Sequence, residues 1–236
     1  GVDLTTAHRA LRAQFDAGDT SAAKLRALWA LHVTGGADAA WMFTLLDHSD
    51  EHIRHWAVRL LADTVPSSRL GPALTHLAGA EPSWLVRMAL ASALGRLDLT
   101  ARVSVAKAMV PELAADSDPN LARLIWYGLQ PCVTAYPGEA GRLAVAARPR
   151  LLRQFIARRL AEDMSSNPAA GAALFASLGQ STEPVLLLDL LAGANRGLAG
   201  LSAVAAPEGA TARLRELMGS SFPTVRHAAT LLAATL

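Results

Sequence analysis

The sequence predicts an all-α protein built as an α-α superhelix, a right-handed solenoid of about seven antiparallel helix pairs. Three observations predict it. An apolar pattern with the helical period recurs along the chain, helix start and stop signals separate its copies, and no segment alternates β-branched and aromatic residues as a strand does. With 236 residues, 52% of them hydrophobic and only 5% aromatic, the chain is long enough for a sizeable core and poor in the residues of a β-sandwich.

Arginine marks the copies of the repeat. Seven arginines each follow the residue that begins an apolar stripe at i, i+3, i+4, i+7 and i+8, namely Arg26, Arg54, Arg87, Arg123, Arg153, Arg196 and Arg226. Their mean spacing is about 33 residues. Of the 28 positions that follow the starts, 24 are apolar, where the composition alone gives about 15. Each stripe is expected on the second helix of a pair, because a pair buries its stripe only by stacking on its neighbours.

Turn and cap residues predict the helix boundaries. Residues 37–46 are expected to form the first helix of one pair and residues 47–50 its turn, with Asp50 as the N-cap of the second helix. Proline marks corresponding starts at Pro82, Pro119, Pro149 and Pro223. Glycine marks expected helix ends at Gly35, Gly36, Gly79, Gly95 and Gly219. Between residues 165 and 209 the stripe is poorer and the register least defined. Residues 1–236 are expected to form one repeat domain whose second helices line its inner face.

Composition excludes several classes of protein. The net charge of +2, from 22 basic and 20 acidic residues, is weak for a dedicated nucleic-acid binder. The single Cys132 excludes an internal disulfide framework and a cysteine-rich zinc site. No uncharged apolar run is long enough to insert in a membrane, and the opening residues GVDLTTAHRALRAQF lack the apolar segment of a signal peptide.

Two segments resemble a known repeat family, residues 47–57 (DHSDEHIRHWA) and residues 222–229 (FPTVRHAA). A turn residue followed by Val/Ile-Arg and an alanine resembles HEAT repeats, which implies a HEAT/armadillo-like solenoid. In that family the turn aspartate and the arginine commonly bridge adjacent repeats as a ladder. The resemblance offers Asp47, Asp116 and Asp118 as partners for Arg54 and Arg123. Arg87 has only Glu81 nearby, so the ladder is expected to be broken there.

Four further stretches resemble, in this order, the helical-repeat region of large exported bacterial proteins described as membrane-bound dehydrogenases. They are residues 25–32 (LRALWALH), 87–95 (RMALASALG), 125–131 (IWYGLQP) and 155–161 (FIARRLA). In those proteins the region follows a β-propeller similar to sugar dehydrogenases and precedes a c-type haem segment with a C-x-x-C-H motif. Neither module, and none of the redox residues, maps onto this chain. The resemblance implies a middle domain excised from a longer periplasmic or exported protein, with its partner modules in the same chain.

One basic run is a candidate anion- or partner-binding patch. It consists of Arg142, Arg148, Arg150, Arg153, Arg158 and Arg159, with no acidic residue between Glu139 and Glu162. Several of these side chains share a helix face, which is the arrangement that a phosphate-docking surface needs. The structural alternative makes Arg153 a ladder residue, places Arg159 at the edge of the core and leaves the rest in solvent.

The remaining candidates have stronger structural than chemical interpretations. His48, His52 and His55 lie near Asp47, Asp50 and Glu51, but no carboxylate is placed to orient a ring for a metal. An interior, hydrogen-bonded role is expected for His32, and a buried, inert thiol is expected for Cys132. Trp29, Trp56 and Trp126 fall on the stripe and are expected in the core. Nucleophile-elbow, P-loop and dinucleotide motifs are all missing.

The sequence therefore predicts a non-catalytic scaffold that binds or spaces other protein modules, with no catalytic residue, metal or cofactor of its own. By resemblance, those modules are the propeller and the haem domain of a parent protein. The alternative is a HEAT-like nucleic-acid-binding or base-processing protein, similar to a DNA glycosylase, that uses the basic run 142–159. That class needs a sunken carboxylate in a basic groove, whereas Glu139, Glu162 and Asp163 only flank the run.

Overall fold

The computed structural model describes residues 3–115, 117–201 and 204–236, and within them it is entirely helical, with fourteen α-helices and three short 3-10 segments. The α-helices are α1 (Thr5–Ala17), α2 (Ser21–Val33), α3 (Ala39–Thr44), α4 (Glu51–Thr64), α5 (Ser67–Ala80), α6 (Trp84–Ala93), α7 (Leu99–Met109), α8 (Pro119–Ala135), α9 (Pro137–Ala146), α10 (Arg150–Asp163), α11 (Pro168–Gly179), α12 (Pro184–Gly197), α13 (Ala210–Met218) and α14 (Pro223–Thr235). The 3-10 segments are η1 (Leu45–Asp47), η2 (Leu94–Arg96) and η3 (Val110–Glu112). The predicted fold class, an α-α solenoid of seven helix pairs, is confirmed.

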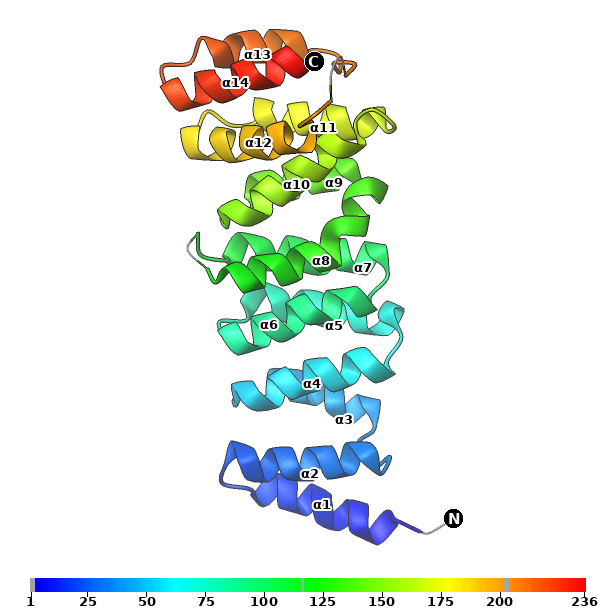
Figure 1. Ribbon diagram of the computed structural model, residues 1–236. Helices are drawn as coiled ribbons and strands as arrows, with labels where there is room; N and C mark the ends of the chain where they lie inside the picture. Colours follow the sequence, from blue (N-terminus) through cyan, green and yellow to red (C-terminus); the bar gives the residue numbers. More distant parts are fainter. Residues whose placement is uncertain (1–2, 116, 202–203) are drawn as a thin grey trace.

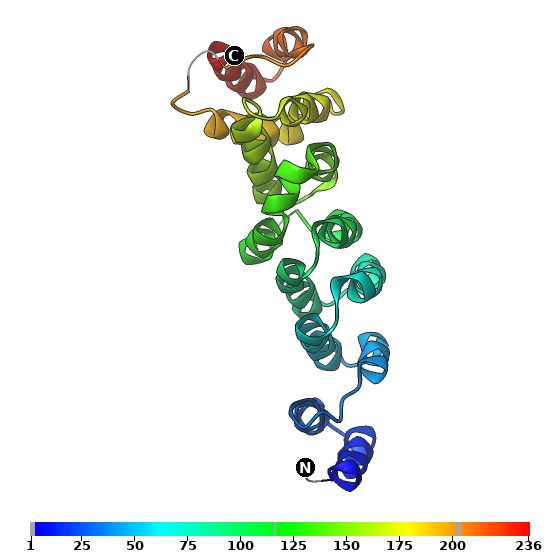
Figure 2. The same cartoon turned by 90° about the vertical axis from the view of Figure 1, so that its right-hand side faces the viewer.

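The helices stack in two layers. The odd-numbered first helices form one layer and the even-numbered second helices the other, and the pairs follow one another from the N-terminus to the C-terminus (Figures 1 and 2). Each second helix contacts the next, and one buried apolar cluster runs from Phe15 in the first pair to Leu232 in the last. The stripe positions Ile53, Val86 and Val225 are fully buried. Stacking therefore supplies the surface that each pair lacks alone.

The cap signals set most of the helix boundaries. Asp50 accepts a hydrogen bond from the His52 N–H at 2.8 Å, so it caps α4 as predicted. Pro119 and Pro223 begin α8 and α14, where a missing N–H leaves no bond unmade. The expected helix over 37–46 is shorter, since α3 is followed by η1. The expected helix end at Gly79 is wrong, because α5 continues to Ala80.

The repeat register was misplaced in three helices, because arginine is a poor marker there. In α12 the buried stripe begins at Leu186, near the start of the helix, whereas Arg196 is exposed in its last turn. Arg26 and Arg123 are likewise exposed. In place of arginine, α12 carries Leu187, which explains why the search skipped to Arg196 and produced the longest spacing between repeats.

The closest contact between helices lies between α10 and α12. A Cβ at Gly193 would lie 2.4 Å from the Gln154 carbonyl oxygen, and one at Gly197 would lie 2.4 Å from the Arg158 carbonyl oxygen. The two glycines are one turn apart and face Ala157 and Ala161 on α10. Small residues on both sides let the backbones approach, so this crossing fixes how the fifth and sixth pairs meet.

Candidate partner-binding surfaces

Four arginines fasten the turn inside their own helix pair. Arg54, Arg87, Arg153 and Arg226 each donate to the backbone carbonyl six residues earlier, in the turn that precedes their helix. The accepting oxygens belong to His48, Glu81, Ala147 and Ser220. A guanidinium suits this task because several N–H donors point in fixed directions. These arginines have a structural role. Arg153 is buried, Arg54 and Arg87 are half-buried, and Arg226 is exposed.

Arg54 also ties its pair to the next one. Its Nε and Nη2 donate to the two carboxylate oxygens of Glu81, at 2.8 and 2.7 Å, and the Glu81 side chain is almost fully buried. The hydrogen bond to Glu81 raises the pKa of Arg54. The expected partner Asp47 is therefore wrong. Glu81 serves both arginines, since its side chain holds Arg54 and its backbone carbonyl accepts from Arg87.

A second inter-repeat tie centres on Asp189, a residue that the sequence search missed. Its fully buried carboxylate accepts from Arg150 Nε at 3.0 Å, Gln154 Nε2 at 3.0 Å and Arg153 Nη1 at 3.3 Å. Gln154 in turn accepts from Arg196 Nη1 at 2.7 Å. Three donors satisfy one buried charge, as stability requires. An aspartate between leucines in the run LLLDLLAG is the signal that would have found it.

The other ladder expectation concerned Arg123. Arg123 Nη1 donates to the Asn120 side chain at 3.3 Å, while Asp118 accepts from the Asn120 N–H and caps α8. Asp118 is thus a capping residue and not a partner of Arg123. Asp116, the other expected partner, lies outside the described residues.

The structure divides the predicted basic run between two layers. Arg142 lies on α9 and pairs with Glu139, whereas Arg158 and Arg159 lie on α10 and pair with Glu162 and Asp163. Arg150 and Arg153 share Asp189, and Arg153 is buried. Only Arg148, exposed in the turn between α9 and α10, has no ion pair within the described ranges. As an anion site the run stays a prediction, with most of its charge already balanced.

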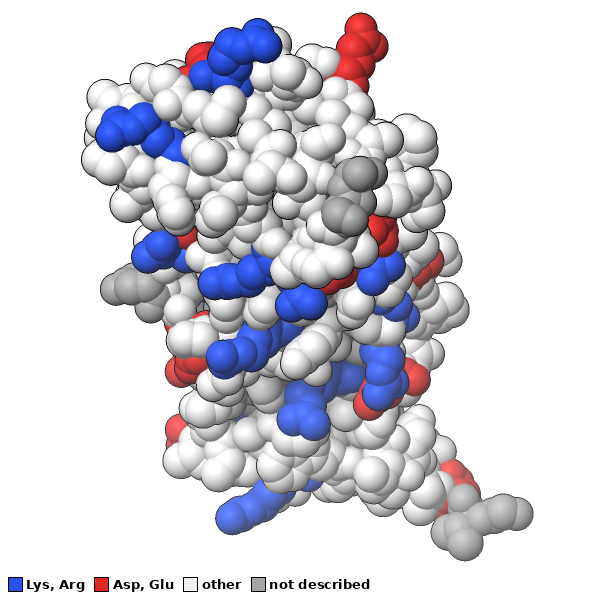
Figure 3. All heavy atoms as spheres, turned by 45° about the horizontal axis from the view of Figure 1, so that its top comes forward, with Lys and Arg blue, Asp and Glu red and all other residues white. Residues whose placement is uncertain are grey.

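An exposed row of residues crosses the second-helix layer. We define this row as the residues nine positions after the N-cap of each second helix, which are Trp29, Arg59, Ser92, Tyr127, Arg158, Ala192 and Leu231. All but Ala192 are exposed, and Tyr127 is 67% exposed. Basic side chains follow one another up this face (Figure 3). Aromatic and basic residues at equivalent positions on stacked helices offer a continuous surface to a partner.

Two tryptophans border the row near the N-terminus. Trp29 and Trp56 meet edge to face with ring centroids 4.9 Å apart, and the Arg59 guanidinium lies 4.7 Å from the Trp56 ring centroid. Trp29 is 37% exposed, so its expected place in the core is wrong. Trp56 and Trp126 are half-buried at the edge of the core, and Trp126 stacks on Phe155.

The histidine cluster does not form a metal site in the part of the chain that the structure describes. The ring of His48 accepts from the Asp50 N–H, and His55 Nδ1 bonds the Leu85 carbonyl of the next pair at 3.1 Å. Burial lowers the pKa of both rings. Cys132 is buried, as predicted, and burial raises the pKa of its thiol. His32 is half-buried at the end of α2.

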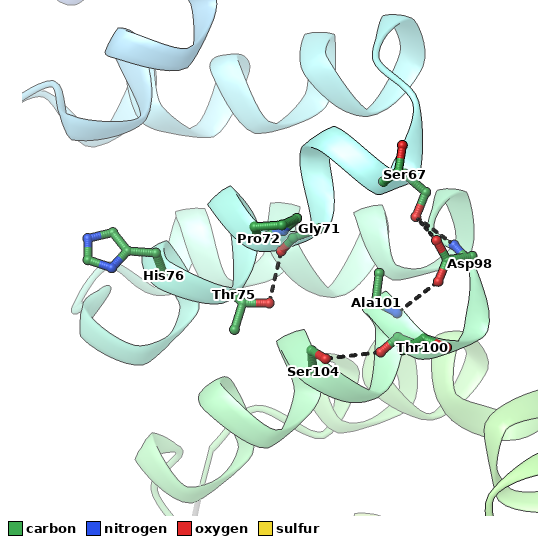
Figure 4. Close-up of a pocket in the computed structure, with 10 residues that line it drawn as sticks. Ser67, Gly71, Pro72, Thr75, His76, Asp98, Thr100, Ala101 and Ser104 are labelled. Atoms are coloured by element: carbon green, nitrogen blue, oxygen red, sulfur yellow. Dashed lines mark hydrogen bonds between the residues drawn. The ribbon is translucent and has the colours of Figure 1, made fainter.

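A groove of about 780 Å³ opens between α5 and α7 in the first-helix layer (Figure 4). Three of its lining hydroxyl groups are already engaged. Ser67 donates across the groove to Asp98 at 2.6 Å, and Thr75 and Ser104 donate within their own helices to the Gly71 and Thr100 carbonyls. The hydrogen bond from Ser67 lowers the pKa of Asp98. These bonds occupy the hydrogen-bond donors of the three hydroxyl groups.

The comparison with protein families agrees with this geometry. The family profile described as HEAT repeats matches residues 9–95 and, in an overlapping copy, residues 39–126. The chain belongs to the HEAT repeat family. No curated protein and no solved structure matches it.

The HEAT repeats make the chain a helical-repeat scaffold, a class that in general carries no catalytic site. HEAT repeats commonly mediate protein interactions. None of the described helices is long and apolar enough to cross a membrane. The matched residues lie in the first four pairs, where both tryptophans and the Arg54–Glu81 tie also lie. The resemblance to the bacterial dehydrogenases remains a prediction.

Proposed function

We propose that this HEAT-repeat chain is a non-catalytic scaffold that binds other protein modules through its second-helix layer and holds them at a fixed spacing. The observation that carries the proposal is the exposed row, which recurs once per pair and is exposed on six of the seven second helices. The four arginines that bond their own turns, and the ion pairs at Glu81 and Asp189, stiffen the stack that carries this row. A stiff surface keeps its partner groups in register and lowers the entropic cost of binding.

By resemblance, the modules are a β-propeller and a c-type haem domain of the same parent chain. Residues 1–236 then form one domain of an exported or periplasmic protein, and the solenoid sets the distance between an oxidising site and an electron acceptor. This chain supplies the spacing and the contact surface, and the redox chemistry belongs to its neighbours.

The test begins with the coding sequence on both sides of the chain. If it encodes the two modules, each is expressed separately and mixed with the solenoid, and association is measured by light scattering after size exclusion. A photo-crosslinking amino acid at Tyr127 on the second-helix layer is expected to capture a module. The matched position Ser68, in the groove between α5 and α7, is expected to capture none. Absence of the modules from the gene refutes the linkage, and capture only from Ser68 refutes the binding surface.

The alternative, a nucleic-acid-binding or base-processing protein that uses the run 142–159, has less support. Five of the six arginines in the run are paired with carboxylates. Carboxylates beside the cations repel phosphate, and a phosphate contact must displace them. Retention of a labelled DNA duplex at moderate salt, lost on replacing Arg148 and Arg158 with Gln, would favour the alternative over the scaffold.

A further inference from the structure

Near the N-terminus, the second-helix layer presents hydrogen-bond donors and cations with no acceptors to match. Arg26 and Arg59 are exposed, and neither forms an ion pair within residues 3–115, 117–201 and 204–236. Arg59 and Trp56 lie on α4, and Arg26 and Trp29 on α2, so the four side chains alternate across two neighbouring helices. Asp63, one turn after Arg59 on α4, is engaged by Arg96 at 2.5 Å.

A shallow recess lies beside the exposed arginine of α4. It lies between α4 and α6, has a volume of about 100 Å³ and is lined by small side chains together with Arg59, Asp63 and Arg96. Asp63 is neutralised there by its ion pair with Arg96, whereas Arg59 lies against the Trp56 ring, which meets Trp29 edge to face. A segment lying along this face therefore meets an aromatic edge, then the guanidinium of Arg59, then a recess in which the remaining charges are paired.

We propose that Arg26, Trp29, Trp56 and Arg59, together with the recess beside Arg59, bind an acidic linear segment of a partner protein. The inference rests on the proposed function and names the kind of segment that the scaffold recognises. Carboxylates pair with Arg26 and Arg59, and an apolar side chain packs on the exposed edge of Trp29. Arginine and tryptophan are the residue types that most often dominate the energy of an interface.

Charge complementarity favours an acidic peptide over a nucleic acid. A nucleic-acid backbone needs a long series of unpaired cations to release its counterions. Farther along the same face, Arg96 and Arg158 are already paired with Asp63 and Glu162. Two guanidiniums without ion pairs on adjacent helices suit the few charges of a short acidic segment and fall short of what a phosphate backbone requires.

The experiment measures fluorescence anisotropy of a fluorescein-labelled peptide that repeats the unit Glu-Glu-Leu-Gly. The controls are the same peptide with Gln for Glu, and single-stranded DNA labelled in the same way. We expect the acidic peptide to bind and the Gln peptide to bind at least about tenfold more weakly. The labelled DNA is expected to bind more weakly than the acidic peptide. Equal binding of the two peptides, or tighter binding of the DNA, would overturn the inference.

Variants locate the site. R26Q/R59Q is expected to weaken the acidic peptide about tenfold, and Trp29→Ala to weaken it to a similar degree. All three residues are exposed, so the far-UV circular dichroism should not change. The control R148Q/R215Q removes the same charge elsewhere and should leave affinity unchanged. An effect of the control pair alone would place binding outside this surface. If the free protein is a dimer and R26Q/R59Q dissociates it, this surface binds a second copy of the chain. Each of these two results would overturn the inference. If the wild-type protein does not bind the acidic peptide but Tyr127 still captures a module, this inference is overturned and the proposed function stands.

Discussion

Replacing Gly193 with alanine tests the crossing of α10 and α12, on which the stacking of the C-terminal pairs depends. The added Cβ would lie 2.4 Å from the Gln154 carbonyl oxygen and 2.8 Å from the Ala157 Cβ. The first of these neighbours is backbone and cannot rotate away. Accommodating the methyl group therefore requires α10 and α12 to separate, which loosens the bonds to Asp189 from Arg153 and Gln154.

Two opposing effects decide the magnitude. Alanine in place of a helical glycine favours the helix by up to about 1 kcal/mol. An extra methyl group in a tightly packed contact costs about 1–3 kcal/mol, and more where backbone must move. Since the obstacle is a helix backbone, we take the upper end of that range. Gly193→Ala is therefore expected to lower the free energy of unfolding by about 2 kcal/mol.

The matched control is Gly79→Ala in α5, where the nearest atom to an added Cβ is 3.9 Å away. There only the helix preference acts, and a gain of up to about 1 kcal/mol is expected. Both variants are unfolded in urea and followed by circular dichroism, with the slope compared because repeat arrays can unfold in parts. A Gly193→Ala protein as stable as the wild type would refute the close crossing, and a loss at Gly79 would show that the packing argument does not distinguish the two sites.

Three further predictions follow from the buried charges and thiol. Glu81→Ala leaves Arg54 without its carboxylate and should lower the free energy of unfolding by about 2–4 kcal/mol in the same urea titration. Asp63→Ala breaks only the exposed pair with Arg96 and should lower it by less than about 1 kcal/mol. Equal losses would contradict the burial of the Arg54–Glu81 pair. Because burial lowers the pKa of His48 and His55, the unfolded chain binds more protons near their ordinary pKa. Stability should therefore fall as the pH drops through about 6.5, and thermal melts of H48Q/H55Q should show a flatter pH dependence than the wild type. Because the Cys132 thiol is buried and its pKa raised, the native protein should not react with Ellman's reagent at neutral pH, and the thiol should react once urea unfolds the chain. Immediate reaction of the native protein would place Cys132 at the surface.

The helix pairs were predictable because their signals are local. An N-cap such as Asp50 and a first-turn proline such as Pro223 act within one turn of the helix that they begin. The apolar period of α4 is likewise written in a dozen neighbouring residues. Nothing beyond the helix is needed to see it, and the count of seven pairs followed directly.

The ladder was not predictable in the same way, because its partners are fixed by stacking. Arg54 lies seven residues from Asp47 and 27 from Glu81, yet the fold joins it to the distant residue. The tie at α12 has the same direction, since Asp189 on the later helix receives the arginines of the earlier one, but its carboxylate lies inside the helix and not in the turn before it. A search for arginine in every copy passes over such a helix by construction.

The tryptophans show why a stripe position does not guarantee burial. The five stripe positions span a wide arc of the helix, and those at its edges face the groove between helices and not the core. Trp29 lies at such an edge and remains partly exposed beside Trp56. The candidate site thus arises from residues that the sequence placed in the core.

The available positive charge was also mispredicted from the sequence. The basic run suggested an anion-binding patch because its arginines are close in sequence, but the fold supplies a carboxylate for five of the six. In the sequence Arg26 served only as a repeat marker and Arg59 was not singled out. Stacking brings their two helices together, and neither arginine has an ion pair among the described residues. In a solenoid whose arginines fasten turns and repeats, the density of arginine along the chain measures how the stack is held, and the charge available to a ligand is what remains after those bonds are made. On α2 and α4 that remainder consists of Arg26 and Arg59.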